Sequence, residues 1–420
     1  MPITFNEATD EFEGANIFGE TLEGFDFSVF GGEITNSGTI NGQLKANSDE
    51  GITITNTFGG VLSKASGSVY AVNLLGNGGR NFSNDGTIFG EARMGNAWDS
   101  FYNSGLIDGQ LKMGKGNDQL INQIIPGIDG GPFTEGTVTG TVRMGAGDDT
   151  VVNGGILHDV RMGAGNDVYS VITLGFGDAL PPVLNDVSGD IRGDSGNDTI
   201  SGGDTDESFY GGSGNDILIG EGGRDKLVGG TGNDQLFGGN GNDKLSGGNG
   251  DDTIDGGNNN DDISGGGDND RILAGSGNDK VNGNAGNDTI FGGSGNDRLS
   301  GADGDDVIEG GAGRDTMFGG DGDDVFIFRG RTEADEIRGF AEGDQIELFI
   351  TTGAIVTYAD VMANTEFVGN NAIINLSEVF ATGGLSLGSD RGSVLTVRNV
   401  DATDLTSDAF NIIDDFITVV

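Results

Sequence analysis

The chain has no cysteine, one histidine, one tryptophan and only five prolines in 420 residues. Without cysteine it forms no disulfide and offers no thiol nucleophile. Because His158 is the single histidine, an HExxH zinc site is excluded. No run of about 18 apolar residues occurs, so we expect no membrane span.

Basic residues are also scarce, at 21 Lys and Arg against 67 Asp and Glu, which gives a net charge of −46. Such a charge opposes compaction unless cations neutralise it. We therefore expect divalent cations as partners and no nucleic acid. Residues 1–32 contain no Lys or Arg and no apolar core run, so they do not predict an N-terminal secretory signal.

Glycine is abundant, with 83 residues, and much of it follows a strict period. Residues 193–327 divide into fifteen nine-residue units of the form G-G-x-G-[ND]-D-x-U-x, where U is apolar. Position six is Asp in fourteen units and Glu207 in the fifteenth, and position eight is apolar from Ile200 to Phe326. A disordered Gly/Asp linker would not keep both features, so the period predicts ordered structure.

This spacing suits calcium. Glycine allows the positive φ angles of tight turns and exposes backbone carbonyls, and Ca²⁺ takes six to eight oxygen ligands. The residues around position eight predict a short strand with its apolar side chain inward. Two units would close one coil of eighteen residues, and coils would stack about 4.8 Å apart. The position-six carboxylates would then form columns along both edges, with calcium between successive turns.

These units resemble the repeats-in-toxin (RTX) nonapeptides of calcium-binding β-rolls. The resemblance implies several bound Ca²⁺ ions and an extracellular protein. The predicted ligands are Asp198, Asp216, Asp225, Asp234, Asp243, Asp252, Asp261, Asp270, Asp279, Asp288, Asp297, Asp306, Asp315 and Asp324. Units that depart from the pattern, above all residues 202–210 around Glu207, leave their own sites open to question.

A weaker repeat covers residues 33–192, with copies at 84–95 and 103–114. Each copy pairs an Asn-x-Gly turn with a Met-Gly half-unit, so the pattern predicts the same coil with a calcium-type turn on one edge only. Asp118, Asp149 and Asp167 are the predicted further calcium ligands. Asp99 holds the same position, and the sequence leaves open whether it binds calcium or not. The Met94, Met113, Met144 and Met162 column predicts core packing.

The fold class predicted is all-β: a parallel β-solenoid of degenerate 18–19-residue coils, then the calcium-binding β-roll, then a β-rich C-terminal cap. The predicted domains are residues 1–32 as a cap or assembly segment, 33–192 as a solenoid with insertions at 122–134 and 171–185, 193–327 as the roll, and 328–420 as the cap. Residues 335–348 resemble the segment that closes many such rolls. Residues 414–420 resemble the C-terminal signal of type I secretion in Gram-negative bacteria.

A column of basic residues precedes the single-edge turns: Arg93, Lys112, Arg143, Arg161 and Arg192. Stacked coils would align them as one stripe. They either pair with neighbouring acids such as Asp108 and Asp190, or form a docking line for an anionic glycan or lipopolysaccharide.

No arrangement of nucleophile, base and acid stands out in the sequence, and we expect no enzyme. The function predicted is a secreted structural protein of the cell surface or extracellular matrix that folds and self-assembles into a layer, sheath or filament on binding calcium. A secreted glycan-binding adhesin is the first alternative. A polysaccharide lyase or epimerase is the second, because such enzymes use parallel β-helices.

Overall fold

The computed structural model describes residues 11–12, 16–17, 21–23, 27–29, 32–37, 39–41, 44–47, 52–57, 61–63, 70–75, 77–125, 134–171, 189–329, 334–350, 358–368, 371–375, 394–398, 405 and 409–414. The chain divides into two compact units, Met1–Leu218 (unit 1) and Ile219–Val420 (unit 2). Most of segment 1–32, the middle of both insertions and residues 415–420 lie outside the described residues.

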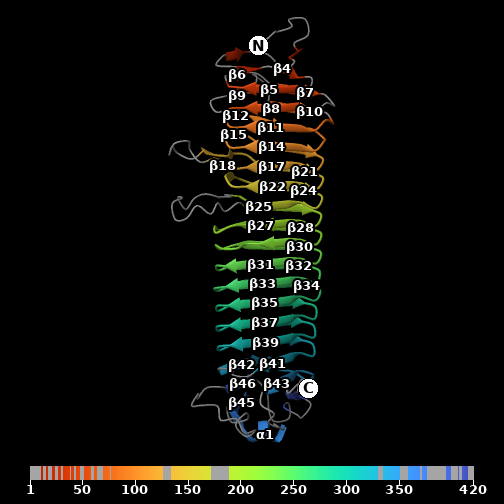
Figure 1. Ribbon diagram of the computed structural model, residues 1–420. Helices are drawn as coiled ribbons and strands as arrows, with labels where there is room; N and C mark the ends of the chain where they lie inside the picture. Colours follow the sequence, from red (N-terminus) through yellow and green to blue (C-terminus); the bar gives the residue numbers. More distant parts are fainter. Residues whose placement is uncertain are drawn as a thin grey trace, which may run out of the picture. The chain divides into compact units, whose positions relative to one another are not determined.

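Unit 1 is built from parallel strands stacked coil upon coil (Figure 1). The first ladder, 1a, contains β1 (Glu11–Phe12), β4 (Phe27–Val29), β7 (Leu44–Asn47), β10 (Tyr70–Leu75), β13 (Glu91–Arg93), β16 (Leu111–Lys115), β21 (Val142–Ala146), β24 (Val160–Ala164), β26 (Ile191–Ser195) and β28 (Ser208–Ser213). The second, 1b, contains β2 (Asn16–Ile17), β5 (Gly32–Asn36), β8 (Ile52–Asn56), β11 (Arg80–Asn84), β14 (Asp99–Asn103), β17 (Gln119–Asn122), β22 (Thr150–Asn153), β25 (Val168–Val171) and β27 (Thr199–Ser201).

A third ladder, 1c, makes the early coils three-sided. It contains β3 (Thr21–Glu23), β6 (Thr39–Asn41), β9 (Val61–Ser63), β12 (Thr87–Phe89), β15 (Leu106–Asp108), β20 (Thr137–Val138) and β23 (Ile156–Leu157). The prediction that these coils match those of the roll was therefore wrong. The Asn-x-Gly corner turns the chain into an extra Thr/Ile strand, whose branched side chains favour β-structure.

The corner between ladders 1b and 1c contains a buried column of asparagines: Asn36, Asn56, Asn84, Asn103, Asn122 and Asn153. Each side-chain amide donates to the next, with N–O distances of 2.8 to 2.9 Å, and Asn153 Nδ2 donates to Tyr169 Oη at 3.3 Å. The corner glycines have no room for a side chain, because a Cβ atom on Gly105 would overlap the carbonyl oxygen of Gly86. The corner is thus held by amides that need no ion.

The interior of unit 1 is apolar. Met94, Met113, Met144 and Met162 are at most 1% exposed, which confirms their predicted core role. Phe82 and Phe101 stack in neighbouring coils, with ring centroids 4.7 Å apart. The first insertion begins and ends in an antiparallel pair, β18 (Ile124–Ile125) with β19 (Thr134–Glu135), so the chain leaves the solenoid there as a hairpin.

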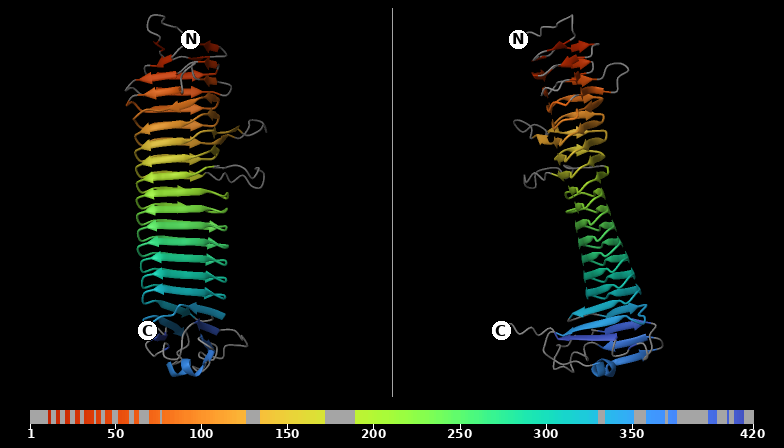
Figure 2. Two further views of the ribbon diagram at one scale, coloured as in Figure 1. Left: turned by 180° about the vertical axis from the view of Figure 1, so that it is seen from behind. Right: turned by 90° about the vertical axis from the view of Figure 1, so that its right-hand side faces the viewer.

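Unit 2 has two ladders, which Figure 2 shows from behind and from the side. Ladder 2a contains β30 (Lys226–Thr231), β32 (Lys244–Asn249), β34 (Asp262–Gly267), β36 (Lys280–Ala285), β38 (Arg298–Asp303), β40 (Thr316–Asp321), β42 (Ala334–Arg338) and β46 (Val394–Arg398). Ladder 2b contains β31 (Gln235–Asn240), β33 (Thr253–Asn258), β35 (Arg271–Ser276), β37 (Thr289–Ser294), β39 (Val307–Ala312), β41 (Val325–Arg329), β43 (Gln345–Ile350) and β47 (Phe410–Asp414). The division between the units falls inside β29 (Ile217–Ile219).

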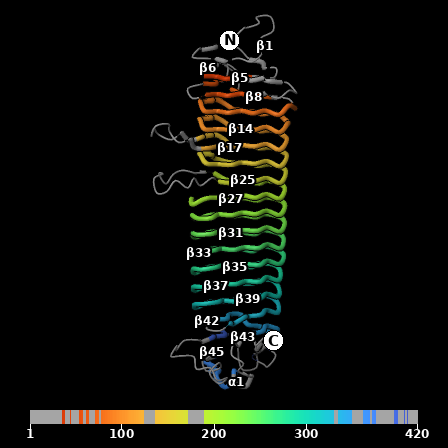
Figure 3. The backbone as a smooth tube through the Cα atoms, in the orientation of Figure 1, coloured from red at the N-terminus to blue at the C-terminus, as the bar shows by residue number. Residues whose placement is uncertain are grey.

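Each nonapeptide of unit 2 supplies one strand, as the tube in Figure 3 follows coil by coil. The strand alternates inward and outward, so the position-eight side chain and the next first-position glycine both face the interior. Leu245, Ile254 and Ile272 are accordingly at most 1% exposed.

The far end of unit 2 changes pattern. Ladder 2a ends with β45 (Asn371–Asn375) and β44 (Thr365–Val368), which pair antiparallel, beside the short helix α1 (Tyr358–Ala363). Phe326 packs against Phe340, with centroids 6.2 Å apart. No helix in the described ranges is long and apolar enough to cross a membrane. The structure confirms the predicted all-β, parallel solenoid class.

Candidate metal centre

Every aspartate predicted as a calcium ligand lies buried in a column, at most 3% exposed. In unit 2 one column follows one edge of the coils and the second follows the other. The backbone N–H of each aspartate donates to Oδ1 of the aspartate one coil further on, for example Asp252 to Asp270 and Asp270 to Asp288, both at 2.8 Å. The carboxylates are therefore locked in register by the backbone.

Unit 1 has one such column, on the edge between ladders 1a and 1b. It runs through Asp118, Asp149, Asp167, Asp198 and Asp216, with N–O distances of 2.7 to 2.8 Å. The Met-Gly half-units thus place Asp118, Asp149 and Asp167 in the same arrangement as the nonapeptides.

The second oxygen of these carboxylates has a different environment. Oδ2 is buried and accepts no hydrogen bond from any described residue at the following positions: Asp118, Asp149, Asp167, Asp198, Asp252, Asp261, Asp270, Asp279, Asp288, Asp297, Asp306 and Asp324. A buried charge without a partner is very costly. A cation beside each Oδ2 would remove that cost.

The first-position glycines show what else faces that oxygen. A Cβ atom on Gly256 would lie 2.5 Å from the carbonyl oxygen of Ala274 and 2.7 Å from Asp261 Oδ2. One on Gly292 would lie 2.5 Å from the carbonyl oxygen of Gly310 and 2.7 Å from Asp297 Oδ2. Carboxylate and carbonyl oxygens therefore converge beside a glycine, which is the donor set that Ca²⁺ prefers.

The donor set is mostly backbone. Among the described residues, no three acidic or histidine side chains gather at one point. Each coil adds only one carboxylate to a given column, so carbonyl groups of adjacent turns have to complete the shell. Calcium tolerates such ligands, whereas zinc prefers nitrogen and sulfur.

Burial changes the protonation of the columns. Burial, together with a smaller contribution from neighbouring carboxylates, raises the pKa of Asp118 and of Asp270 to about 8. Burial likewise raises the pKa of Asp198 and Asp306 to about 7, against an ordinary value near 3.8. The metal-free columns therefore favour protons at a pH where free aspartate is charged.

The carboxylate of Glu207, the predicted irregular position, accepts hydrogen bonds from its own turn. Thr205 Oγ1 donates to Glu207 Oε1, and the N–H of Gly203 donates to Oε2 at 3.5 Å. Two other departures keep the normal backbone, since Asn259 and Asp268 replace glycine with φ of 78° and 73°. Asn and Asp tolerate this left-handed region better than most residues.

Sequence reasoning missed two members of the columns, Asp335 and Asp344. They accept the N–H groups of Asp315 and Asp324 at 3.0 and 3.1 Å, one coil beyond the last nonapeptide. A signal was available, because Asp335-Glu336-Ile337 and Asp344-Gln345-Ile346 repeat the D-x-U triplet of the nonapeptide. Asp344 Oδ2 also accepts the N–H of Ala341 at 2.7 Å.

The predicted basic column exists in ladder 1a. Strand register pairs Arg93 with Lys112, Lys112 with Arg143, Arg143 with Arg161, and Arg161 with Arg192. Lys112 forms an ion pair with Glu91 at 2.9 Å, and Arg192 one with Asp190. The exposed side chains of Arg93, Arg143 and Arg161 make no ion pair with a described residue.

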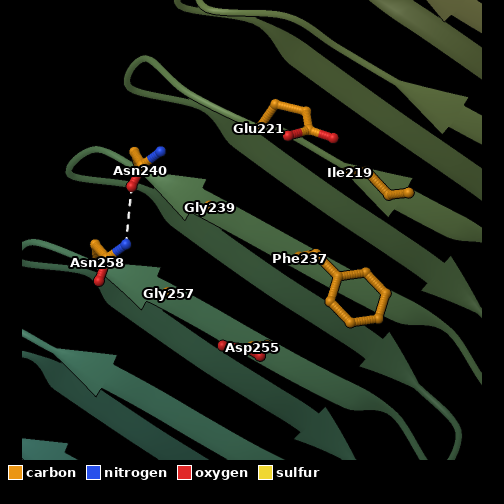
Figure 4. Close-up of a pocket in the computed structure, with 8 residues that line it drawn as sticks. All are labelled: Ile219, Glu221, Phe237, Gly239, Asn240, Asp255, Gly257 and Asn258. Carbon is orange, nitrogen blue, oxygen red and sulfur yellow. Dashed lines mark hydrogen bonds between the residues drawn. The ribbon is translucent and has the colours of Figure 1, made fainter.

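Unit 2 also has a shallow depression of about 400 Å³ on the outer face of β31 and β33 (Figure 4). Phe237, Glu221 and Asp255 line it, and Asn258 Nδ2 donates to Asn240 Oδ1 at 2.8 Å. Its eight lining residues include no histidine, lysine, arginine or tyrosine. The charged side chains of its lining, Glu221 and Asp255, are therefore both acidic.

A family model of the RTX calcium-binding nonapeptide repeat matches overlapping segments from residue 188 to residue 326. This chain carries an RTX calcium-binding β-roll. The match begins just before the first nonapeptide and ends at Phe326, and the aspartates at position six of that segment are those with buried carboxylates.

Several solved structures are similar, among them the following two. One is a hyperactive, Ca²⁺-dependent, β-helical antifreeze protein from an Antarctic bacterium, 20% identical over 80% of this chain and 86% of that chain, with a TM-score of 0.31. The other is the extracellular lipase LipA from Serratia marcescens, 16% identical over 58% of this chain and 44% of that chain, with a TM-score of 0.23. Neither similarity is close enough to indicate a function. A search of curated proteins gave no match.

Asp270→Asn tests the columns directly. The amide still accepts the N–H of Asp252 but removes the charge, so we expect a loss of about one or two calcium ions per chain, counted by native mass spectrometry. Asp251→Asn is the matched control, because that exposed carboxylate sits next to Asp252 on the outside of the turn and should cost no ion. Equal counts for both variants and the wild type would contradict the site.

The raised pKa values predict an inverted pH dependence without calcium. Between about pH 4 and pH 8 the folded columns bind more protons than the unfolded chain, so the metal-free fold loses stability as pH rises through the raised pKa values. Circular dichroism in chelator should therefore show more β-structure at pH 5.5 than at pH 8. Saturating calcium should reverse the order, since Ca²⁺ requires the deprotonated form. Identical metal-free spectra at both pH values would disprove this.

Proposed function

We propose that this chain is a secreted, calcium-binding structural protein of the bacterial cell surface or extracellular matrix, without enzymatic activity, that self-assembles when calcium folds it. The observation that supports this most is the set of buried carboxylates whose Oδ2 atoms accept no hydrogen bond from a described residue and lie beside glycines that also approach backbone carbonyls. Nearly all of the described chain is repeat scaffold, as a structural protein requires.

Calcium would act as the switch between export and folding. Extracellular calcium modules bind with dissociation constants of about 10⁻⁴ to 10⁻³ M, well above cytosolic calcium. The columns would therefore stay empty and the roll unfolded inside the cell, a form suited to type I export through the signal proposed at residues 414–420. Outside, binding and folding become one event, as in other metal-coupled folds.

Calcium would also permit assembly. Each bound ion adds two positive charges to a chain of net charge −46, so repulsion between copies falls. We propose contacts through residues 1–32 and the insertions 122–134 and 171–185. Phe89 and Trp98, 45% and 63% exposed, add apolar surface in unit 1. Contacts between unlike surfaces generate open fibres or sheets, because nothing closes the array.

Light scattering and electron microscopy test the assembly. Full-length protein in millimolar calcium should form particles far larger than a monomer, with a fibre or lattice in micrographs, and chelation should dissolve them. Deleting residues 1–32 should leave a monomer with the β-signal of the folded roll. A full-length chain that stays monomeric at high concentration in calcium would end the structural proposal.

A secreted adhesin for anionic glycans is the second candidate, favoured by the basic column of ladder 1a. Three of its five side chains, those of Arg93, Arg143 and Arg161, are exposed and without an ionic partner among the described residues. They lie at paired positions of one ladder, whose successive strands are about 4.8 Å apart. A polyanion such as lipopolysaccharide could contact all three.

Binding of purified lipopolysaccharide in calcium tests this second candidate. Replacing Arg93, Arg143 and Arg161 by Gln should weaken binding roughly tenfold, since exposed ion pairs contribute up to about 1 kcal/mol each. The control replaces Lys226, Lys244 and Lys280 of unit 2 by Gln, which removes the same charge elsewhere. Equal weakening by both triple variants would indicate a general charge effect and no docking line.

A further inference from the structure

Arg80 stands where the next aspartate of the unit 1 column would be. Strand register pairs Arg80 with Asp99, and Asp99 is the N-terminal carboxylate of that column. The N–H of Arg80 donates to Asp99 Oδ1 at 2.9 Å, just as the N–H of Asp99 donates to Asp118 Oδ1 at 2.9 Å. The backbone therefore continues the column, while the side chain changes from an anion to a cation.

The guanidinium group of Arg80 is fully buried beside that carboxylate. Arg80 Nη1 lies 3.8 Å from Asp99 Oδ1, both side chains are 0% exposed, and Nη1 also donates to the carbonyl oxygen of Gly78. Asp99 Oδ2 accepts the N–H of Gly95 at 3.0 Å. Each carboxylate oxygen of Asp99 thus accepts a hydrogen bond, and the carboxylate has the Arg80 cation beside it. By contrast, Oδ2 of Asp118, Asp149 and Asp167 has neither a donor nor a cation among the described residues.

Beyond Arg80 the column ends. The residue paired with Arg80 on the other side is Ile52 in β8, which carries no charge. In the described part of residues 32–103, the only buried charged side chains are Arg80 and Asp99. The opposite corner of these coils is the neutral asparagine column, which includes Asn84 and Asn103. In this described part of unit 1, each of the two buried charges therefore has the other as its counter-charge.

We propose that the Arg80 guanidinium is a tethered cation that takes the place of calcium at this end of the aspartate column, so that the coils of residues 77–103 fold without calcium. An arginine side chain stays charged at every physiological pH and is always present, so this pair needs no ion from outside. The proposal rests on calcium binding by the aspartate columns and is independent of the proposed self-assembly. These coils would then present a ready strand edge on which the next coil pairs when calcium arrives.

Hydrogen exchange of the full-length protein in chelator tests the proposal. In the wild type, amides of β11 and β14 should stay protected while those of the repeats from β33 to β40 exchange quickly. Arg80→Met leaves the Asp99 carboxylate buried without its cation, so exchange in β11 and β14 should accelerate at least about 100-fold. The matched control Arg93→Met removes an exposed arginine from the neighbouring strand β13 and should leave the protection unchanged.

A double variant separates charge from packing. Arg80→Met combined with Asp99→Asn removes both charges and keeps an acceptor for the N–H of residue 80, so it should regain most of the protection in chelator. Fluorescence of Trp98, the single tryptophan, should follow the same order, because it precedes Asp99 directly. Three results would each overturn the proposal: a wild type whose β11 and β14 exchange as fast as the repeats, an Arg80→Met variant with wild-type protection, or a double variant no better protected than Arg80→Met.

Discussion

The structure depends on one constraint: coil after coil, the aspartate columns bury carboxylates such as those of Asp252, Asp270 and Asp288, whose second oxygen no described residue satisfies. Oδ1 accepts the N–H of the preceding coil, which fixes the register, and Oδ2 then faces backbone carbonyls beside a glycine. Stacking more coils adds more such oxygens. Order in this part of the chain therefore depends on what neutralises these oxygens, whether a bound cation or a proton.

The chain satisfies these carboxylates in different ways along its length. In the nonapeptides the Oδ2 atoms are available to bind calcium, as the match to the RTX calcium-binding repeat indicates. At Asp99 the N–H of Gly95 occupies Oδ2 and Arg80 supplies the charge, and at Asp344 the N–H of Ala341 occupies Oδ2. Asp99 begins the unit 1 column and Asp344 ends one of the two unit 2 columns, and each accepts an N–H from its own turn. At these two column ends the protein itself supplies a partner for the second carboxylate oxygen.

Much of the roll could be predicted from the sequence because its information is local. Nine residues contain the turn, the ligand and the inward side chain, and repetition determines the register. The third ladder of unit 1 was missed because three-residue strands such as Thr87–Phe89 are too short to show a period. Arg80 was missed because its turn is one residue longer than that of Asp99 and breaks the spacing. The third ladder and the position of Arg80 both depend on contacts between coils, which a pattern along the sequence does not show.

Asn103 and Asp118 show how a small chemical difference decides which corner of a coil leaves a buried oxygen unsatisfied. Both lie buried in columns that cross successive coils at a corner. An amide donates through nitrogen and accepts through oxygen, so Asn103 is satisfied by Asn84 and Asn122. An ionised carboxylate only accepts, so Asp118 accepts the N–H of Asp99 through Oδ1 and its Oδ2 remains unsatisfied by any described residue. A ladder of amides is therefore complete by itself, whereas a ladder of carboxylates with the same backbone register requires a cation at each step.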